Sequence, residues 1–190
     1  QEEAKTRTDV RNETIVTIDG DDAKDLDDAI SLRRLKNGNY YLGVHIADVS
    51  YYVEEGSELD KEALARGTSI YLVDRVIPML PHKLSNGICS TQSSCGSFAI
   101  SCLWKLPSRE VIDHDIVESV INSTERMTYN NVNKILAGDK KLQEEYSHVC
   151  DLFFLMKELA EILQKTREDR GAIDFDTNEA KVLVDEKVNQ

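Results

Sequence analysis

The pattern of apolar and polar positions divides the chain into a strand-rich part and a helical part. Short apolar or β-branched runs separated by polar residues fill the first two thirds, and from about residue 130 apolar residues recur every three or four positions. The predicted strands are 15–18, 29–35, 40–46, 69–73, 75–80, 98–106, 111–121 and 172–184. The predicted helices are 58–66, 130–137 and 142–170. This order predicts an α+β fold, a mixed and mostly antiparallel sheet with packed helices.

Glycines and capping residues mark the ends of several of these elements. Asn37-Gly38 lies between two predicted strands and predicts a type I′ hairpin. Ser57 is a suitable N-cap for the first helix, and Gly67 is a suitable residue to end it. The sequence contains no internal repeat or low-complexity tract, which indicates one α+β unit.

The charge balance bears on the class of partner. The chain has 35 acidic and 23 basic residues, a formal net charge of −12. Because phosphate contacts come from Lys and Arg, an acidic body repels nucleic acid. Composition alone therefore favours a protein that does not bind nucleic acid. The alternative is that the basic surfaces belong to other parts of a longer protein.

Apolar runs and cysteines indicate the compartment. No apolar run approaches the roughly 18 residues that a membrane span needs, and the first residues do not resemble a signal peptide. We therefore expect a cytoplasmic protein without membrane contact. The cysteines have neither Cys-x-x-Cys spacing nor a histidine at zinc-finger spacing, so free thiols are expected. They are Cys89, Cys95, Cys102 and Cys150.

An acidic segment follows the first predicted strand, with six aspartates within ten residues. Such crowding raises carboxylate pKa values unless cations neutralise the charge. Oxygen ligands without a nearby His or Cys suit hard cations such as Mg²⁺ or Mn²⁺, which can assist phosphoryl transfer. An EF-hand is excluded because, counting from Asp19, its sixth and twelfth positions are Lys24 and Ile30. A solvated acidic loop is the alternative that this segment alone leaves open.

The segment TIDGDDAKDLDDA resembles the signature of the ribonuclease II/ribonuclease R family, whose RNB catalytic domain spaces four aspartates as D-x5-D-x-D-D. Asp19, Asp25, Asp27 and Asp28 match this spacing. The likeness continues in order through nearly the whole chain and is greatest to the ribonuclease R branch of low-GC Gram-positive bacteria. The matching segments are 43–53, 59–90, 126–139 and 170–185.

The resemblance implies a processive 3′→5′ exoribonuclease that hydrolyses single-stranded RNA to nucleoside 5′-monophosphates. It assigns Asp19, Asp25 and Asp28 to binding of Mg²⁺, with Mn²⁺ as the alternative ion. It assigns Asp27 to positioning of the attacking water, so that all four aspartates are catalytic candidates. Other aspartates of the segment fall outside the signature and are expected to be solvated. A non-catalytic RNA-binding or scaffold relative of the same fold is the alternative function.

The resemblance also implies two substrate-binding aromatic residues. Tyr71 and Phe175 match residues that stack on the 3′-terminal bases, and stacking of this kind tolerates any base. Viewed alone, either side chain is more typical of core packing. The histidines match no catalytic position and are expected to be structural or exposed. They are His45, His82, His114 and His148.

The same resemblance predicts how the chain divides into domains. Residues 1–13 are predicted to be a linker from a preceding domain, and residues 14–190 the N-terminal portion of the catalytic domain. The C-terminal catalytic portion, a later arginine, and the cold-shock and S1 domains would lie outside this chain. These missing parts would supply the basic surface. We therefore expect a monomeric fragment with weak or no nuclease activity of its own.

One segment departs from the family pattern. Residues 89–98 read C-S-T-Q-S-S-C-G-S-F, where the family typically reads C-S-L-N-P-x-V-D-R-F. Codons exist for residues 91–97 that read L-N-P-A-V-D-R when shifted by one base, so we hypothesise a local frameshift. The intact mass of the purified chain tests this hypothesis. A mass equal to that of the printed sequence would show that these residues are physically present and exclude a transcription error.

Overall fold

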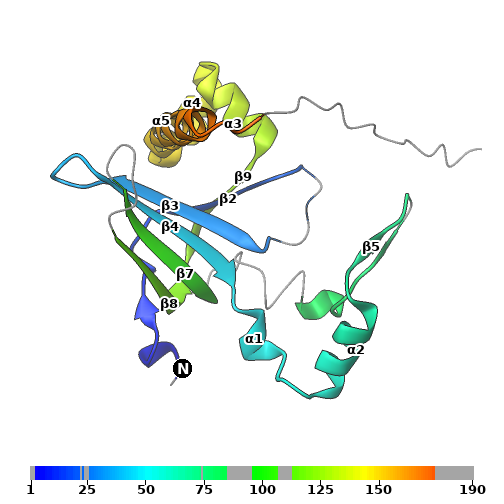
Figure 1. Cartoon of the computed structure of the whole chain (residues 1–190). Coiled ribbons are helices and arrows are strands. Elements are labelled where there is room, and N and C mark those ends of the chain that lie inside the picture. The colour runs from blue at the N-terminus through cyan, green and yellow to red at the C-terminus, as the bar shows by residue number, and fades with distance from the viewer. Residues whose placement is uncertain are drawn as a thin grey trace, which may run out of the picture.

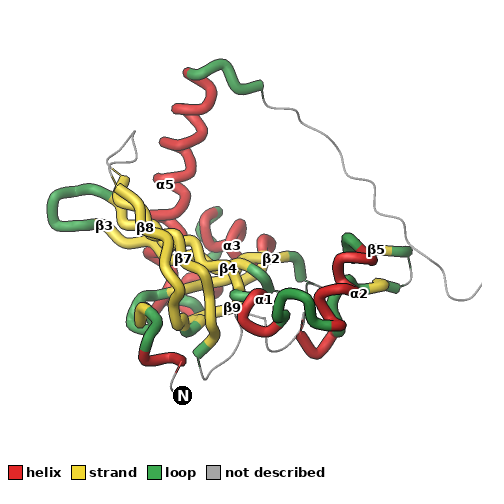
Figure 2. Tube along the Cα trace, turned by 60° about the horizontal axis from the view of Figure 1, so that its bottom comes forward, coloured by secondary structure: helices red, strands yellow, loops and turns green. Residues whose placement is uncertain are grey.

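The computed structural model describes residues 3–21, 23, 26–73, 75–84, 96–106 and 113–173. A seven-stranded sheet forms the body, three helices cover one of its faces, and a smaller unit of two helices and a hairpin extends from one end (Figure 1). In the view of Figure 2 the smaller unit again lies to one side of the sheet, away from the longest helix. The predicted α+β fold is confirmed.

The order of strands in the sheet is β1-β8-β7-β4-β3-β2-β9. Their bounds are β1 Thr8–Asp9, β2 Ile15–Asp19, β3 Asp28–Arg34, β4 Tyr40–Ala47, β7 Ser97–Leu106, β8 Asp113–Ile121 and β9 Ser123–Thr128. The strands from β2 through β3, β4 and β7 to β8 pair in antiparallel fashion. Strands β1 and β9 add to the two sides in parallel pairs with β8 and β2. The sheet is therefore mixed and mostly antiparallel, as predicted.

One face of the sheet packs against the helices α3 (Tyr129–Leu136), α4 (Lys140–Glu145) and α5 (Ser147–Asp169). A continuous apolar core joins the two layers, and each fully buried large side chain in it contributes about 1.5–3 kcal/mol. Its buried members are Val16, Leu32, Tyr40, Leu106, Met127, Ile135, Val149, Leu152, Phe153 and Leu159.

The prediction of one long helix over 142–170 is wrong in one respect, because two helices occupy this range. Tyr146, with φ −103° and ψ 28°, ends α4 and begins α5. Its partly buried side chain packs against the helical core, so tertiary packing interrupts a segment whose local pattern is helical throughout. Within the described residues, no helix combines the length and apolarity needed to cross a membrane.

The smaller unit contains α1 (Val49–Tyr52), α2 (Glu58–Arg66) and a hairpin of β5 (Ile70–Tyr71) and β6 (Val76–Ile77). The Ser57 hydroxyl accepts the backbone N–H of Asp60 at 3.2 Å, and Gly67 ends α2 at φ 73°. Both capping predictions are confirmed. The strands predicted for 69–73 and 75–80 are shorter than expected, because only two residues of each pair with the other.

The hairpin between β3 and β4 forms at the predicted place but with a different turn. A type I′ turn needs a positive φ at both central residues. Gly38 has φ 85°, whereas no non-glycine residue in the described ranges has a positive φ. The N–H of Gly38 donates to the Leu35 carbonyl at 2.9 Å, and the N–H of Leu35 donates to the Asn39 carbonyl at 2.7 Å. The connection is therefore a longer turn in which Gly38 alone supplies the left-handed residue.

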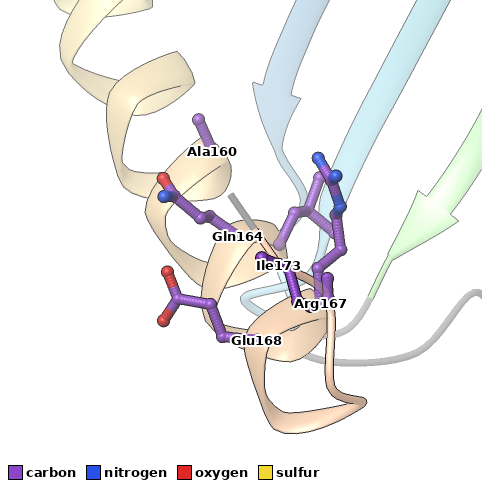
Figure 3. Close-up of a pocket in the computed structure, with 7 residues that line it drawn as sticks. Ala160, Gln164, Arg167, Glu168 and Ile173 are labelled. Carbon is purple, nitrogen blue, oxygen red and sulfur yellow. The ribbon is translucent and has the colours of Figure 1, made fainter. Parts of the chain in front are cut away.

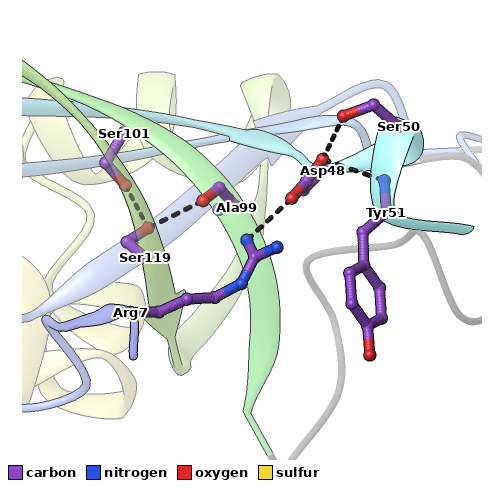
Figure 4. A network of polar contacts seen from close by, with 7 residues as sticks. All are labelled: Arg7, Asp48, Ser50, Tyr51, Ala99, Ser101 and Ser119. Carbon is purple, nitrogen blue, oxygen red and sulfur yellow. Dashed lines mark hydrogen bonds and ion pairs between the residues drawn. The ribbon is translucent and has the colours of Figure 1, made fainter. Parts of the chain in front are cut away.

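Residues 3–13, predicted as a linker, contain a short 3₁₀ helix and the sheet strand β1. Arg7 lies between them and is 7% exposed. Its Nη1 donates to Oδ2 of Asp48 at 2.7 Å (Figure 4). Its guanidinium lies over the rings of Tyr51 and Phe98. This segment is therefore packed into the fold.

The buried Arg7–Asp48 pair fixes the point where β4 passes into α1. Burial alone would raise the pKa of Asp48, but hydrogen bonds from the Ser50 hydroxyl, Arg7 and the Tyr51 N–H outweigh it and hold the pKa below its ordinary value. The Ser50 and Tyr51 groups bond to Oδ1 at 2.6 and 3.2 Å, so Asp48 is also the N-cap of α1. The role of Asp48 in this structure is therefore structural.

The other face of the sheet, opposite the helices, buries a histidine. His45 of β4 is completely buried, and burial lowers the pKa of its imidazole from 6.5 to about 4. This burial is compatible with the expectation that the histidines are structural or exposed. Of the other histidines, His82, His114 and His148 are exposed.

The buried imidazole predicts a pH dependence of stability. Because the folded state disfavours the protonated ring, the unfolded chain binds the extra proton between about pH 6.5 and pH 4. The free energy of unfolding should therefore be unaffected by His45 above pH 6.5 and fall by about 3 kcal/mol as the pH drops to 4. Urea unfolding at several pH values measures this. His114→Gln, at an exposed position, should keep the slope and His45→Asn should reduce it; equal slopes would contradict the prediction.

Candidate active site

The acidic segment connects β2 to β3, and the pairing between these two strands ends before the segment begins. Strands β2 and β3 are in register only at Ile15–Ser31 and Val16–Ile30. On its other side β2 pairs with β9 along its whole length, and Asp19, its last residue, lies opposite Thr128. The side chain of Asp19 is half-buried. Asp19 is thus held by β9, on one side of the opening between the strands.

Two polar side chains from a distant part of the sequence form hydrogen bonds with the start of the loop. The Arg126 guanidinium donates to the carbonyl of Ala23, and the side-chain amide of Asn130 donates to the carboxylate of Asp21. Near the end of the loop, the side chain of Leu26 is fully buried and thereby anchors this end in the protein interior. The loop is thus attached to β9 and to the first turn of α3. Asp21, expected to be solvated, is exposed and also accepts this hydrogen bond.

The last two aspartates of the segment lie where β3 begins. The carbonyl of Asp27 accepts the backbone N–H of Ala47 at 2.8 Å, and Asp28 lies opposite Ile46 in the antiparallel ladder. Both aspartate side chains are exposed, whereas the next residue, Ala29, is buried. The backbone that carries these two carboxylates is therefore part of the central ladder, and the carboxylates themselves face solvent.

The structure brings three of the four predicted aspartates to the two ends of one short loop. Asp19 ends β2, and Asp27 and Asp28 begin β3, whereas Asp25 lies outside the described residues. Among the residues that are described, no group of three His, Cys, Asp or Glu side chains is arranged to hold a metal ion. The donors at the loop are carboxylate oxygens, which suit Mg²⁺ or Mn²⁺. The metal site remains a prediction.

Tyr71 lies on a different part of the molecule from the acidic segment. It is in β5 of the hairpin and is 67% exposed, so it is not a core residue. In Figures 1 and 2 the hairpin lies toward the same side of the view as the β2 end that carries Asp19. Large apolar residues around Tyr71 are also exposed: Ile70, Leu72, Val73, Val76 and Ile77. Phe175, predicted to be its partner, lies outside the described residues.

Sequence reasoning missed the residues that support the loop. Arg126 and Asn130 lie in the segment RMTYNN, which carried the resemblance without a role for either residue. No local signal identifies them, because each contacts the loop from more than 100 positions away in the sequence. The short spacing between β9 and α3 places both side chains beside the loop.

A hollow of about 440 Å³ lies elsewhere, between the last turns of α5 and the residues that follow it (Figure 3). Its lining is Ala160, Leu163, Gln164, Arg167, Glu168, Ala172 and Ile173. Ile173 is 76% exposed, so the hollow is open to solvent. The acidic segment contributes no residue to this lining, and the hollow therefore adds nothing to the candidate site.

Comparisons with known proteins agree with the acidic signature. The RNB domain family matches residues 7–190. Ribonuclease R 1 of Lactococcus lactis is 56% identical over 182 residues, which cover 95% of this chain and 22% of that protein. The structure of Mycoplasma genitalium RNase R in complex with ribose-methylated single-stranded RNA is similar, with a TM-score of 0.84 and 32% identity over 98% of this chain and 29% of that one.

A more distant structure shares the fold alone. Yeast Ssd1, described as a pseudonuclease, is 22% identical with a TM-score of 0.65, over 72% of this chain and 17% of that one. The chain spans about a quarter of the length of the ribonuclease R proteins that it matches. From the family match over almost its entire length and the identity to ribonuclease R, we conclude that this chain belongs to the RNB domain family.

Proposed function

We propose that this chain carries the metal-binding aspartates of a 3′→5′ exoribonuclease that hydrolyses single-stranded RNA to nucleoside 5′-monophosphates. The observation that carries the proposal is the placement of the signature aspartates. Asp27 and Asp28 are exposed at the start of a strand anchored in the central ladder, and Asp19 ends the strand at the other end of the same loop. Identity of 56% to a ribonuclease R supports the reaction class.

In this proposal Asp19, Asp25 and Asp28 hold Mg²⁺, and Mn²⁺ is the alternative ion. A bound divalent ion polarises the phosphate and lowers the pKa of a water molecule. Asp27 accepts a hydrogen bond from the attacking water and orients it toward phosphorus. The Asp27 carbonyl, fixed by the Ala47 N–H, limits how far this carboxylate can move. The anchors Arg126 and Asn130 hold the other end of the loop.

Tyr71 would provide a stacking surface for bases near the 3′ end of the RNA, with Phe175 on the other side of the base. The exposure of Tyr71 supports this role, because a stacking platform must be open to its ligand. Stacking without base-specific hydrogen bonds suits an exonuclease that degrades any sequence.

The chain alone would be an incomplete enzyme. It covers about a quarter of the ribonuclease R proteins that it matches, and its net charge of −12 opposes binding of a polyanion. Basic and RNA-binding surfaces in the rest of a longer cytoplasmic, monomeric protein would overcome this repulsion. Weak or no nuclease activity of the isolated chain is the corresponding expectation.

Substitution of Asp27 tests the proposed chemistry in the full-length protein. Asp27→Asn removes the charge and keeps the shape, so the release of mononucleotides from 3′-labelled single-stranded RNA in Mg²⁺ should fall at least about a hundredfold. Binding of the same RNA, measured by fluorescence anisotropy, should change little. Chelation of divalent ions should abolish the activity, and Mg²⁺ or Mn²⁺ should restore it.

Asp21→Asn is the matched control for this experiment. Asp21 belongs to the same loop, is exposed and falls outside the signature, and asparagine keeps an acceptor for Asn130. This variant should retain most of the activity. A full-length protein that binds RNA without degrading it would favour the non-catalytic alternative. Robust Mg²⁺-dependent degradation by the 190-residue chain alone would contradict the proposed incompleteness.

Substitution of Tyr71 tests the stacking role separately. Tyr71→Ala in the full-length protein should weaken binding of short single-stranded RNA by about 1–3 kcal/mol and change the length of the final product, whereas Tyr71→Trp should preserve both. Leu72→Ala is the control, because Leu72 is an exposed, non-aromatic neighbour in the same hairpin. Equal losses in the two alanine variants would argue against stacking and for a general packing role of the hairpin.

A further inference from the structure

A chain of hydroxyl and imidazole groups crosses the buried face of the sheet and joins four neighbouring strands. Ser31 Oγ of β3 lies 3.0 Å from His45 Nε2 of β4, and His45 Nδ1 lies 2.6 Å from Ser101 Oγ of β7. Ser101 Oγ lies 2.6 Å from Ser119 Oγ of β8, which donates to the Ala99 carbonyl at 3.1 Å. Figure 4 shows the end of this chain. The four side chains are at most 3% exposed.

The chain has one consistent direction of hydrogen bonding. A carbonyl oxygen only accepts, so the Ser119 hydroxyl gives its hydrogen to Ala99 and must accept from Ser101. Ser101 has then used its own hydrogen and must accept from His45 Nδ1–H. In a neutral ring the other nitrogen, Nε2, is then an acceptor, and the Ser31 hydroxyl donates to it.

Burial and local space support the neutral ring. The two groups that hydrogen-bond to the ring, the Ser31 and Ser101 hydroxyls, are uncharged and so do not stabilise an imidazolium, and a charged ring is costly in a buried site. Gly43, opposite Ser31 in the ladder, leaves room for the bond between Ser31 and His45. A Cβ at position 43 would lie 2.4 Å from Ser31 Oγ and 2.7 Å from His45 Nε2.

The chain lies close to the proposed catalytic aspartates. His45 is opposite Ala29 in the ladder, and two residues later the Ala47 N–H bonds to the carbonyl of Asp27. We propose that His45, held as the neutral Nδ1–H tautomer, is a positioning residue that fixes the ends of β3 and β4 where Asp27 and Asp28 emerge. The catalytic part of this proposal rests on the proposed function; the tautomer and the clamping of the strands do not.

The tautomer is tested directly by nitrogen NMR on the 190-residue chain labelled at histidine with ¹⁵N. At pH 7 the His45 resonances should show a protonated Nδ1 and an unprotonated Nε2. His45→Asn identifies these resonances by their loss. A ring protonated at Nε2, or at both nitrogens, would overturn the proposal.

The clamp is tested by a double-substitution cycle that reads the Ala47 amide. Ser31→Ala leaves the buried Nε2 without its donor, so hydrogen exchange of the Ala47 N–H should accelerate about tenfold. His45→Asn keeps an N–H near the Nδ1 position and removes Nε2. Adding Ser31→Ala to His45→Asn should therefore accelerate exchange much less than Ser31→Ala does alone. Equal effects in both backgrounds would overturn the clamp.

The link to catalysis is tested in the full-length protein, with Ser123→Ala of β9 as a control outside the row of hydrogen-bonded side chains. Ser31→Ala should lower kcat on single-stranded RNA about tenfold with KM nearly unchanged, and Ser123→Ala should leave both near their original values. An unchanged kcat, together with faster Ala47 exchange, would overturn the positioning role. If the full-length protein has no nuclease activity, the proposed function fails and the NMR and exchange results still decide the clamp.

Discussion

The β3–β4–β7 ladder buries side chains on both of its faces, and the rest of the structure depends on how this is achieved. The register is continuous from Asp28–Ile46 to Arg34–Tyr40 and, on the other side of β4, from Tyr40–Leu106 to Ala47–Ala99. One face buries large apolar side chains under α3 and α5. The opposite face places Ala29, Ala99 and Gly43 around His45, where small residues leave room for polar groups. Those groups are tolerated because each has a hydrogen-bond partner.

The residues at the end of β4 and the start of β3 are fixed by contacts of this ladder. The Arg7–Asp48 pair fixes the chain immediately after β4, and the Ala47–Asp27 bond fixes the residue immediately before β3. The start of the acidic loop has an independent support from β9 and α3, through Arg126 and Asn130. Several aspartates repel one another in a short loop, so a rigid frame on both sides is needed to hold them in place. These contacts thus hold the loop in place against the repulsion between its carboxylates.

Local signals in the sequence were sufficient for some features and insufficient for others. The hairpin near Asn37-Gly38 and the caps Ser57 and Gly67 depend on a few consecutive residues, so their positions could be predicted. The turn type could not, because Asn37 does not take the positive φ that its residue type permits. Strand β9 was missed because STERMT lacks an apolar alternation, and only Met127 of this strand is buried. Its formation depends on parallel pairing with the distant β2.

For the candidate site, too, some features could be predicted from the sequence and others could not. The spacing of Asp19, Asp27 and Asp28 is a sequence property, and it was sufficient to place them in a family. Their supports could not be predicted, because each contact joins residues far apart in the chain. The role of Asp48 was also hidden, since an aspartate after a strand looks the same whether it binds a ligand or pairs with a buried arginine. Only the 3% exposure of both side chains identifies the second role.

The fold by itself does not decide the function, because it also occurs in a pseudonuclease. Arg7 and Asp48 stabilise the scaffold, and a non-catalytic relative would need them as much as an enzyme does. Asp27 and Asp28 differ, because their side chains are exposed and contribute little to packing. Adjacent exposed carboxylates in a chain that is already strongly acidic add repulsion to the folded state. The proposed function accounts for them, because a divalent cation would gain from their charge and prefers oxygen donors.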